Sequence, residues 1–287
     1  MAESTEKIKK RVFYLGPVGT FTEQAALEYD PNAVLIPVDS IPEAFASVVT
    51  SGVADEAVVP IENSLEGPVI YTVDLLIHES KLMIRHELVL PIEQCLIVRQ
   101  GTSLNEIEAV FSHPQALGQC RKFIEKCFPK AQQIAALSTT AAVKEMLSHP
   151  KGAAIAARRA AELYGAEIIA YGVQDNSSNA TRFVVLGHTD HEPTGRDKTS
   201  ICFSIKEDKP GALVEILTEF SSRGINLAKI ESRPSKETLG KYIFLIDLEG
   251  HRLDGKVSEA LKQVKKRTTP EHFKIFGSYP QYVSAAD

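Results

Sequence analysis

The segment Lys209–Gly224, KPGALVEILTEFSSRG, decides the fold of the C-terminal part of the chain. Four apolar residues in it recur at the i, i+3, i+4, i+7 spacing of one helix face, namely Leu213, Ile216, Leu217 and Phe220. Gly224 ends the pattern, because glycine readily adopts the backbone conformation that follows a helix. The segment therefore predicts an amphipathic helix with one face packed on a core.

On both sides of this helix in the sequence, apolar and polar residues alternate as they do in β-strands. Strands are expected at Ser200–Ile205, Ile225–Glu231, Tyr242–Leu248 and Phe273–Phe276. A second helical stripe follows the third strand and consists of Val257, Ala260, Leu261 and Val264. The order β-α-β-β-α-β is that of a ferredoxin-like unit, so a small domain of this kind is predicted over residues 199–280.

The stretch before this domain, residues 188–198, reads HTDHEPTGRDK. It is polar, carries one proline and one glycine, and lacks any periodicity, which is typical of a linker. His188 and His191 have no partners at a spacing suited to a metal ion, so no metal site is expected here.

Residues 11–187 show a different rhythm, in which short apolar runs alternate with amphipathic stretches. Such alternation favours an α/β fold with a largely parallel sheet, or two such sheets. The apolar runs Met83–Leu90 and Cys95–Val98 are separated at Pro91 and predict a crossing between two lobes. Lobe one is expected at about 11–90 and 180–187, and lobe two at about 91–179.

Bulk properties limit the partners. The chain has 287 residues, 44% of them hydrophobic and 24% charged, and a net charge of -5, so it has room for two domains and no feature that favours nucleic acid or an anionic membrane. The four cysteines show no CxxC spacing, which fits a reducing compartment. The N-terminal residues lack the apolar run of a signal peptide, and we expect a cytoplasmic protein.

Polar clusters follow several of the expected strands. They read GPVGTFT at 16–22, ENS at 62–64, SHPQ at 112–115 and SSNAT at 177–181. Open α/β sheets bind ligands at the carboxyl ends of their strands. The first cluster also offers free N–H groups at a helix start, a site for a carboxylate or phosphate, but it lacks the third glycine of a dinucleotide fingerprint.

The residue types in these clusters limit the chemistry. They are hydroxyls and amides, without paired carboxylates, a cysteine nucleophile or a metal-ligand set. This composition disfavours covalent hydrolysis, phosphoryl transfer and redox reactions, and favours a reaction that needs hydrogen-bond donors and shape. Each cluster alone is also compatible with a helix cap or an ordinary turn, and His113 with either a base or a capping role.

Five stretches together resemble the prephenate dehydratase family with its C-terminal ACT regulatory domain. They are GPVGTFTEQAA at 16–26, PIENSLEGPV at 60–69, SHPQALGQC at 112–120, NATRF at 179–183 and PGALVEILTEFSSRGINLAKIESRPS at 210–235. Each is weak alone, but five in this order are specific. The resemblance covers about Arg11 to Tyr279.

This resemblance implies a catalytic domain like the type II periplasmic binding proteins, with the Arg182–Leu186 strand returning to lobe one. It implies conversion of prephenate to phenylpyruvate, with loss of water and carbon dioxide, as a step of phenylalanine biosynthesis. It implies no cofactor and no metal, phenylalanine as an effector at the ACT domain, and a homodimer or homotetramer. Neither nucleic acid nor membrane is an expected partner.

The resemblance also assigns residues. Thr181 matches the catalytic threonine. The expected substrate-binding residues are Thr20, Phe21, Asn63, Ser64, Gly67, Ser112, Gln115, Ser178, Asn179, Arg182 and Phe183. The expected effector-binding residues are Gly211, Ala212, Leu213, Val214, Asn226, Leu227, Glu231, Ser232, Arg233 and Pro234. Whether Arg182 or His113 faces the substrate, and whether the effector inhibits or activates, stay open at this stage.

Three rival interpretations remain. Arogenate, the aminated analogue of prephenate, is an alternative substrate. A non-enzymatic small-molecule receptor is a second, because two-lobed folds of this kind also serve as binding proteins. The third is a chain in which only the amino-acid-sensing domain works.

Overall fold

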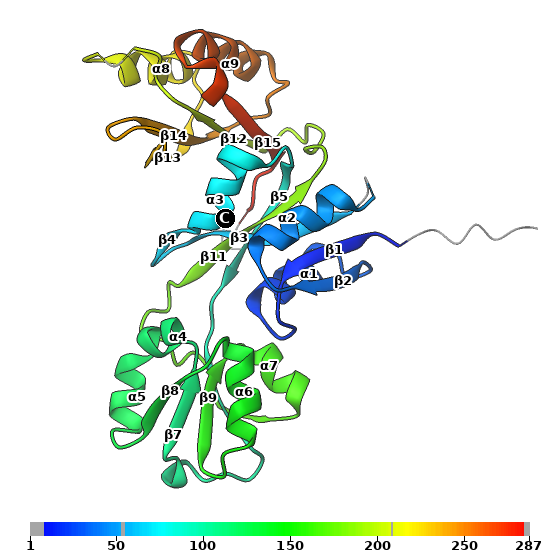
Figure 1. Ribbon diagram of the computed structural model, residues 1–287, viewed down its shortest axis with the longest axis vertical. Coiled ribbons are helices and arrows are strands. Elements are labelled where there is room, and N and C mark those ends of the chain that lie inside the picture. The colour runs from blue at the N-terminus through cyan, green and yellow to red at the C-terminus, as the bar shows by residue number, and fades with distance from the viewer. Residues whose placement is uncertain (1–8, 53–54, 208, 284–287) are drawn as a thin grey trace, which may run out of the picture. The chain divides into compact units, whose positions relative to one another are not determined.

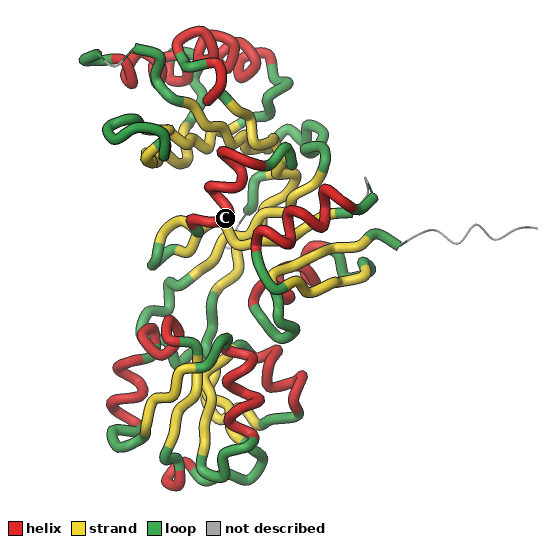
Figure 2. The backbone as a smooth tube through the Cα atoms, in the orientation of Figure 1, coloured by secondary structure: helices red, strands yellow, loops and turns green. Residues whose placement is uncertain are grey.

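The computed structural model describes residues 9–52, 55–207 and 209–283. The described residues form two compact units, one made of 9–44, 58–69 and 89–183, and the other of those within 45–57, 70–88 and 184–283. Figures 1 and 2 show the helices and strands of each unit. Within the described residues, no helix combines the length and the apolar character needed to cross a membrane.

The first sheet carries the strands of the predicted first lobe. Its order is β2-β1-β3-β11-β5, with β4 paired to β3. The strands are β1 (Arg11–Leu15), β2 (Val34–Val38), β3 (Glu56–Asn63), β4 (Gly67–Pro68), β5 (Met83–Pro91) and β11 (Ala180–Gly187). The late strand β11 lies between β3 and β5, as the resemblance implies, and this order brings the C-terminal end of β3 beside the start of β11.

Three helices belong to the same part of the sequence. They are α1 (Phe21–Tyr29), α2 (Ile41–Thr50) and α3 (Ile70–Asp74), and α3 continues into the π-helical segment η1 (Leu75–Glu79). The sequence predicts helix starts near Thr22, Pro42 and Val69, and all three helices begin within one residue of these positions. The sequence signals for these starts are a hydroxyl residue that caps the helix, or a proline close to its first residue. Such signals depend only on neighbouring residues in the sequence.

The second sheet has the order β10-β6-β9-β7-β8. Its strands are β6 (Cys95–Val98), β7 (Ala109–Ser112), β8 (Gln132–Ala135), β9 (Gly152–Ala156) and β10 (Glu167–Ala170). The helices are η2 (Leu104–Glu106), α4 (Pro114–Gln119), α5 (Arg121–Cys127), α6 (Thr139–Leu147) and α7 (Arg158–Tyr164). One apolar core joins the sheet to α6 and α7, a second joins it to α4 and α5, and Figure 1 shows these helix pairs flanking the strands.

The expectation of largely parallel pairing is wrong for half of this sheet. Strand β7 runs parallel to β8 and β9, but β6 runs antiparallel to β9 and to β10. Strand β6 follows β5 directly, through residues 92–94. The partners of β6 in this sheet are β9 and β10, which follow much later in the chain, so the local pattern around β6 did not reveal the direction of pairing.

The C-terminal residues form the predicted ferredoxin-like unit. Its elements are β12 (Asp197–Phe203), α8 (Ala212–Ser221), β13 (Leu227–Pro234), β14 (Tyr242–Glu249), α9 (Gly255–Arg267), η3 (Pro270–His272) and β15 (Lys274–Pro280). The sheet order is β13-β14-β12-β15, in which β12 is antiparallel to both neighbours. A single apolar core joins this sheet to α8 and α9, and it contains Ile216 and Phe220 from the predicted stripe. The predicted helix face and β-α-β-β-α-β order are confirmed.

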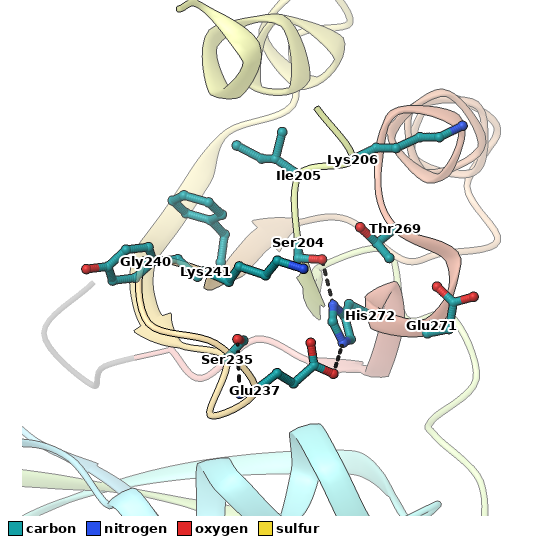
Figure 3. Close-up of a pocket in the computed structure, with 12 residues that line it drawn as sticks. Ser204, Ile205, Lys206, Ser235, Glu237, Gly240, Lys241, Thr269, Glu271 and His272 are labelled. Atoms are coloured by element: carbon teal, nitrogen blue, oxygen red, sulfur yellow. Dashed lines mark hydrogen bonds and ion pairs between the residues drawn. The ribbon is translucent and has the colours of Figure 1, made fainter. Parts of the chain in front are cut away.

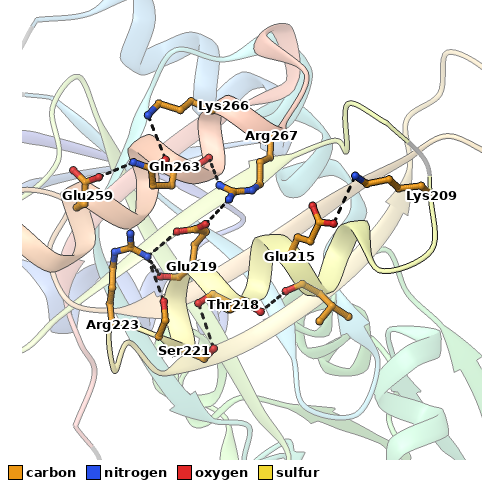
Figure 4. Close-up of polar contacts among 12 residues, drawn as sticks. Lys209, Glu215, Thr218, Glu219, Ser221, Arg223, Glu259, Gln263, Lys266 and Arg267 are labelled. Carbon is orange, nitrogen blue, oxygen red and sulfur yellow. Dashed lines mark hydrogen bonds and ion pairs between the residues drawn. The ribbon is translucent and has the colours of Figure 1, made fainter.

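Glu219 links the two helices of this unit on their polar side, as Figure 4 shows. Its carboxylate lies 2.7 Å from Nη1 of Arg223, which follows the end of α8, and 2.8 Å from Nη2 of Arg267 at the end of α9. The Glu219 side chain is 14% exposed. Ion pairs near a surface contribute at most about 1 kcal/mol each, so the apolar core remains the main stabilising contact.

The stretch expected as a linker is packed on the ferredoxin-like unit. Asp190 forms an ion pair with Arg252, with Oδ2 2.5 Å from Nε, and accepts a hydrogen bond from Ser278 N at 3.1 Å. Strand β12 begins at Asp197, three residues before the expected strand start. The polar composition did not predict this packing. A polar loop has the same sequence pattern whether its hydrogen-bond partners are water molecules or other residues of the protein.

Gly277 marks a close backbone approach between β15 and β5. Its φ is 146°, and a Cβ at this position would lie 2.1 Å from Ile84 O. Only glycine fits such a contact, because the atom that a Cβ would meet belongs to the backbone and cannot move aside as a side chain could.

Candidate active site

A cavity of about 310 Å³ lies in the first unit, where the polar strand ends gather. Thr20, Phe21 and Thr22 line it from the start of α1, and His113, Gln115 and Ala116 from the start of α4. Further lining residues come from the start of α6, from β3 and from β11, and they include Ser138, Thr139, Asn63, Thr181 and Phe183. This volume suits a small ligand.

Asn63 organises the polar group at the centre of the cavity. Its Oδ1 accepts hydrogen bonds from the backbone N–H groups of Leu65 at 3.0 Å and Glu66 at 3.2 Å. These two donors fix the orientation of the amide, since only the oxygen can accept. The Nδ2 group therefore points the other way, and it donates to Asn179 Oδ1 at 2.8 Å and to Thr181 Oγ1 at 2.9 Å.

This arrangement decides the direction of the Thr181 hydroxyl. An amide N–H only donates, so Thr181 Oγ1 must be the acceptor in its bond with Asn63. Within the described part of the chain, Thr181 Oγ1 makes no other hydrogen bond. The hydroxyl proton of Thr181, a residue that is 9% exposed and lines the cavity, is thus available to a ligand.

The α1 start is held rigidly against the cavity. Thr20 Oγ1 accepts from Glu23 N at 3.3 Å, and Glu23 Oε2 accepts from Gly19 N at 2.6 Å, which resembles the reciprocal bonds of a capping box. Arg159 Nε lies 3.6 Å from Glu23 Oε2. Nearby Tyr14 has its pKa raised to about 12, first by burial and then by the charge of Glu23, so this phenol stays neutral.

Helix starts supply the cavity with N–H groups in place of charged side chains. Ser138 Oγ accepts from Ala141 N at 2.9 Å at the start of α6, and His113 Nδ1 accepts from Gln115 N at 3.3 Å at the start of α4. His113, one of the two residues left open above, therefore lines the cavity and also caps α4. The positive ends of helix dipoles favour anionic groups.

Six of the twelve expected catalytic and substrate-binding residues line this cavity. They are Thr20, Phe21, Asn63, Gln115, Thr181 and Phe183. They come from four separate stretches of sequence, and the fold brings them together as the strand-end argument predicts.

The other six expected residues do not line the cavity. They lie in the segments that surround it. Ser112 is fully buried and donates to Ile155 O at 2.6 Å. Ser64 Oγ accepts from Ala180 N at 2.9 Å and donates to Ser178 O at 3.0 Å. These bonds hold the 177–181 loop against the end of β3, and direct contact of Ser112, Ser64 or Ser178 with a ligand stays a prediction.

Gly67, Asn179 and Arg182 also lie behind the lining. Gly67 belongs to β4, which pairs with β3 at Asn63. Asn179 is buried between Asn63 and Gln119, and it donates to Gln119 Oε1 at 3.1 Å. Arg182 Nη1 lies 3.8 Å from Glu62 Oε2 and so forms an ion pair with a residue outside the cavity lining.

Sequence reasoning missed several lining residues, among them Gln94 and Gln119. Gln119 stands one helical turn after Gln115, so the helix period could have identified it. Gln94 follows β5 in the short connection to β6, where no periodic pattern exists.

A larger cavity, of about 480 Å³, lies in the ferredoxin-like unit. Figure 3 shows His272 between Ser204 and Glu237, and its ring nitrogens lie 2.7 Å from Ser204 Oγ and 3.1 Å from Glu237 Oε1. Lys206, Lys241 and Glu271 add charge to the lining, and Phe244 adds an aromatic face. None of the ten expected effector-binding residues lines this cavity.

Eight of the ten expected effector-binding residues lie on α8 or β13, and the other two, Gly211 and Asn226, directly precede these elements. Gly211 precedes α8 with a φ of 85°, and Ala212 begins the helix. Glu231 and Arg233 lie on β13, with Arg233 Nη1 3.7 Å from Glu231 Oε1. Their binding of an effector stays a prediction.

Family models, curated relatives and solved structures match this chain over most of its length. The family model described as "Prephenate dehydratase" matches residues 12–191, and the one described as "ACT domain" matches residues 203–266. A bifunctional chorismate mutase/prephenate dehydratase of Aquifex aeolicus is 45% identical over 279 residues, which are 97% of this chain and 75% of that protein. A prephenate dehydratase of Methanocaldococcus jannaschii is 40% identical and is matched over 96% of this chain and 100% of its own length.

Among solved structures, a prephenate dehydratase of Arthrobacter aurescens in complex with L-Phe is similar over the whole fold. It aligns with a TM-score of 0.85 and 37% identity, and covers 96% of this chain and 93% of that one.

Proposed function

Because the chain belongs to the prephenate dehydratase family, with its ACT domain, we propose that it converts prephenate to phenylpyruvate. The single observation that carries the proposal is the Asn63–Thr181 pair, which presents a hydroxyl proton to a cavity whose lining, among the described residues, has neither lysine nor arginine. The family is one of carbon–oxygen lyases, and the cavity offers the neutral donors that such an elimination needs.

The reaction needs one proton and no redox partner. The bond between the ring and its carboxylate breaks, carbon dioxide leaves, and the electron pair moves into the ring. The C–O bond to the ring hydroxyl breaks, and the hydroxyl takes up a proton and leaves as water. Aromatisation of the ring supplies the driving force.

Thr181 would assist the departure of the hydroxyl. Its proton faces the cavity and is not used by Asn63, so it can be donated to the leaving oxygen, and solvent restores it afterwards. Proton assistance of this kind is typically worth about 10²–10⁴ in rate. A threonine hydroxyl is protonated at any working pH, which explains how the site could act without a group of shifted pKa.

The helix starts would hold the two carboxylates. The N–H groups near Thr20 and Ser138 lie at the N-termini of nine-residue helices, and both residues line the cavity. Fixed dipoles of this kind stabilise charge without reorganising during the reaction.

The test is to add prephenate to the purified chain and to follow phenylpyruvate by its absorbance. Formation of phenylpyruvate supports the proposal, and its absence under conditions where the chain is folded contradicts it. The same assay with arogenate measures the alternative substrate, since the residues around the cavity do not separate a ketone from an amine. The ratio of the two kcat/KM values gives the preference.

We further propose that phenylalanine regulates this activity through the stretch 231–234. Arg233 Nη2 lies 3.2 Å from Asp74 Oδ1, and Lys236 Nζ lies 2.5 Å from Asp74 Oδ2. Asp74 ends α3, and α3 follows Val69, a lining residue of the 310 Å³ cavity, directly in the chain. An amino-acid carboxylate bound at Arg233 would compete with Asp74 and thereby release α3.

A second contact of the ferredoxin-like unit lies just after Asp74. Lys274 Nζ donates to Leu76 O at 2.5 Å and also to Ser80 O, at the end of η1. The segment 70–80 is therefore held by three cations, and only one of them belongs to the expected effector stretch. The sign of the response is left to measurement, since a ligand shifts a population only toward the state that it binds better. Pairing into a dimer or tetramer, the cytoplasmic location and the domain boundaries at 187 and 199 stay predictions.

A further inference from the structure

Gln94 lines the 310 Å³ cavity but has no role in the function proposed above. Its backbone is fixed, because its N–H donates to Gln174 Oε1 at 2.9 Å and its carbonyl accepts from Val173 N at 3.0 Å. The residue is only 3% exposed. The main chain of Gln94 is thus held in place beside the cavity.

The side-chain oxygen of Gln94 has no hydrogen-bond partner. Among the described residues that line this cavity, Gln94 is the one with a buried side-chain atom, Oε1, that makes no hydrogen bond. Leaving a buried acceptor unsatisfied costs about 1–3 kcal/mol. A group that enters the cavity and donates a hydrogen bond would remove this cost.

The chemistry of the substrate identifies the donor. This step rests on the proposed function. Both carboxylates and the ketone of prephenate only accept hydrogen bonds at neutral pH, so its single donor is the ring hydroxyl. We propose that Gln94 Oε1 accepts a hydrogen bond from the ring hydroxyl of the substrate.

The proposal agrees with the direction of the Thr181 hydroxyl. The substrate hydroxyl would donate its own proton to Gln94 and accept the proton of Thr181 on a lone pair. These two bonds together orient the leaving oxygen, and the bond to Gln94 persists when the oxygen has become water. Gln94 is therefore a binding residue that positions the leaving group, and no proton passes to it.

The substitution Gln94→Leu tests this role in the full chain, because leucine removes the amide at nearly constant volume. The kcat/KM for prephenate is expected to fall about 10- to 100-fold. The inhibition constant of phenylpyruvate, which has no ring hydroxyl, is expected to stay within about twofold of the parent. Arogenate has the same ring hydroxyl, so its kcat/KM is expected to change by the same factor. If the enzyme does not turn arogenate over, the inhibition constant of arogenate is expected to change by this factor instead.

Two further variants complete the experiment. Gln94→His keeps an acceptor nitrogen and is expected to recover much of the loss. Gln100→Leu, a glutamine whose Nε2 donates to Gly165 O at the surface, is the matched control and is expected to behave as the parent.

Three results would overturn the inference. Unchanged kcat/KM in Gln94→Leu would mean that Gln94 makes no bond to the substrate. Equal weakening of phenylpyruvate inhibition would indicate general damage to the cavity. A change for only one of the two substrates would place Gln94 at the side chain and not at the ring. A parent that turns over neither substrate contradicts the proposed function itself, a result that is distinct from these three.

Discussion

The two cavities of this chain differ in the residues that line them. The cavity of the first unit is lined by hydroxyls, amides, one histidine and apolar groups, whereas the cavity of the ferredoxin-like unit carries Lys206, Lys241, Glu237, Glu271 and His272. The first gathers six of the twelve residues expected from sequence motifs, and the second gathers none of the ten expected for the effector. The cavity to which we assign the dehydration is therefore the smaller of the two, so cavity size alone would not have selected it.

The difference follows from how each fold places its polar residues. In the first unit, motifs stand at strand ends and helix starts, which an α/β fold brings to one place. In the ferredoxin-like unit, the expected effector residues run along α8 and β13, and a strand presents successive side chains to opposite faces. A motif on such an element does not by itself create a pocket.

The largest expected effect on turnover comes from a substitution in the first cavity. Replacing Thr181 by Val keeps the shape and removes the hydroxyl, and kcat for prephenate is expected to fall about 10²–10⁴-fold. Thr181→Ser keeps the hydroxyl and is the matched control, with kcat expected within about tenfold of the parent. Steady-state assays with both variants check this, and a Val variant as fast as the Ser variant would refute the role of the hydroxyl.

The sequence predicted the part of this arrangement whose signals are local. The helix start at Thr20, the end of β3 at Asn63 and the entry to β11 at Thr181 were each readable from turn and cap residues. Gln94 was not, because nothing in its neighbourhood shows that its oxygen lacks a partner. Ser112 was expected in the cavity because it follows a strand, but side chains alternate along a strand, and this one points to Ile155 O.

The next effect concerns the link between the ferredoxin-like unit and α3. Asp74→Asn removes the partner for which a bound amino-acid carboxylate would compete at Arg233. Phenylalanine is expected to bind several-fold more tightly, while its maximal effect on kcat/KM falls about tenfold or more and turnover without phenylalanine stays near the parent value. Calorimetric titration and kinetics with phenylalanine measure the two quantities.

Glu79→Gln supplies the control for this prediction, because it removes the same charge from the adjoining π-helical segment at an exposed residue without an ion pair in the described structure. It is expected to respond to phenylalanine as the parent does. An Asp74→Asn variant that binds phenylalanine more weakly, or that keeps the full response, would contradict the proposed competition. Asp74→Glu, which restores a carboxylate, should regain part of the response.

A smaller effect, on stability and not on turnover, is expected from a substitution in the second cavity. His272→Ala removes the bonds to Ser204 and Glu237 and is expected to lower the free energy of unfolding by about 1 kcal/mol. Turnover of prephenate is expected to be unchanged, because the dehydration is assigned to the other cavity. Urea unfolding and the phenylpyruvate assay measure both, and a loss of turnover without loss of stability would show that this histidine takes part in the reaction.

The smallest effect compares the cysteines in both parts of the chain. Burial raises the pKa of Cys95 to about 11 and of Cys120 and Cys202 to about 12, so these thiols hold almost no thiolate at pH 8. Cys127 is exposed. We expect one thiol per folded chain to react rapidly with a disulfide reagent at pH 8, and four after unfolding. Rapid reaction of two or more in the folded chain would disagree with the burial described here.

The most direct test of the central claim is a double-mutant cycle between Asn63 and Thr181. Asn63→Asp turns the amide donor into an acceptor, which would draw the Thr181 proton away from the substrate and lower kcat, while charge repulsion would show mainly in KM. If Asn63 acts by directing that proton, the Asn63→Asp change has no further effect on kcat once Thr181 is Val. If the two losses in kcat multiply instead, the residues act independently, and the assignment of the Thr181 proton to the leaving hydroxyl is wrong.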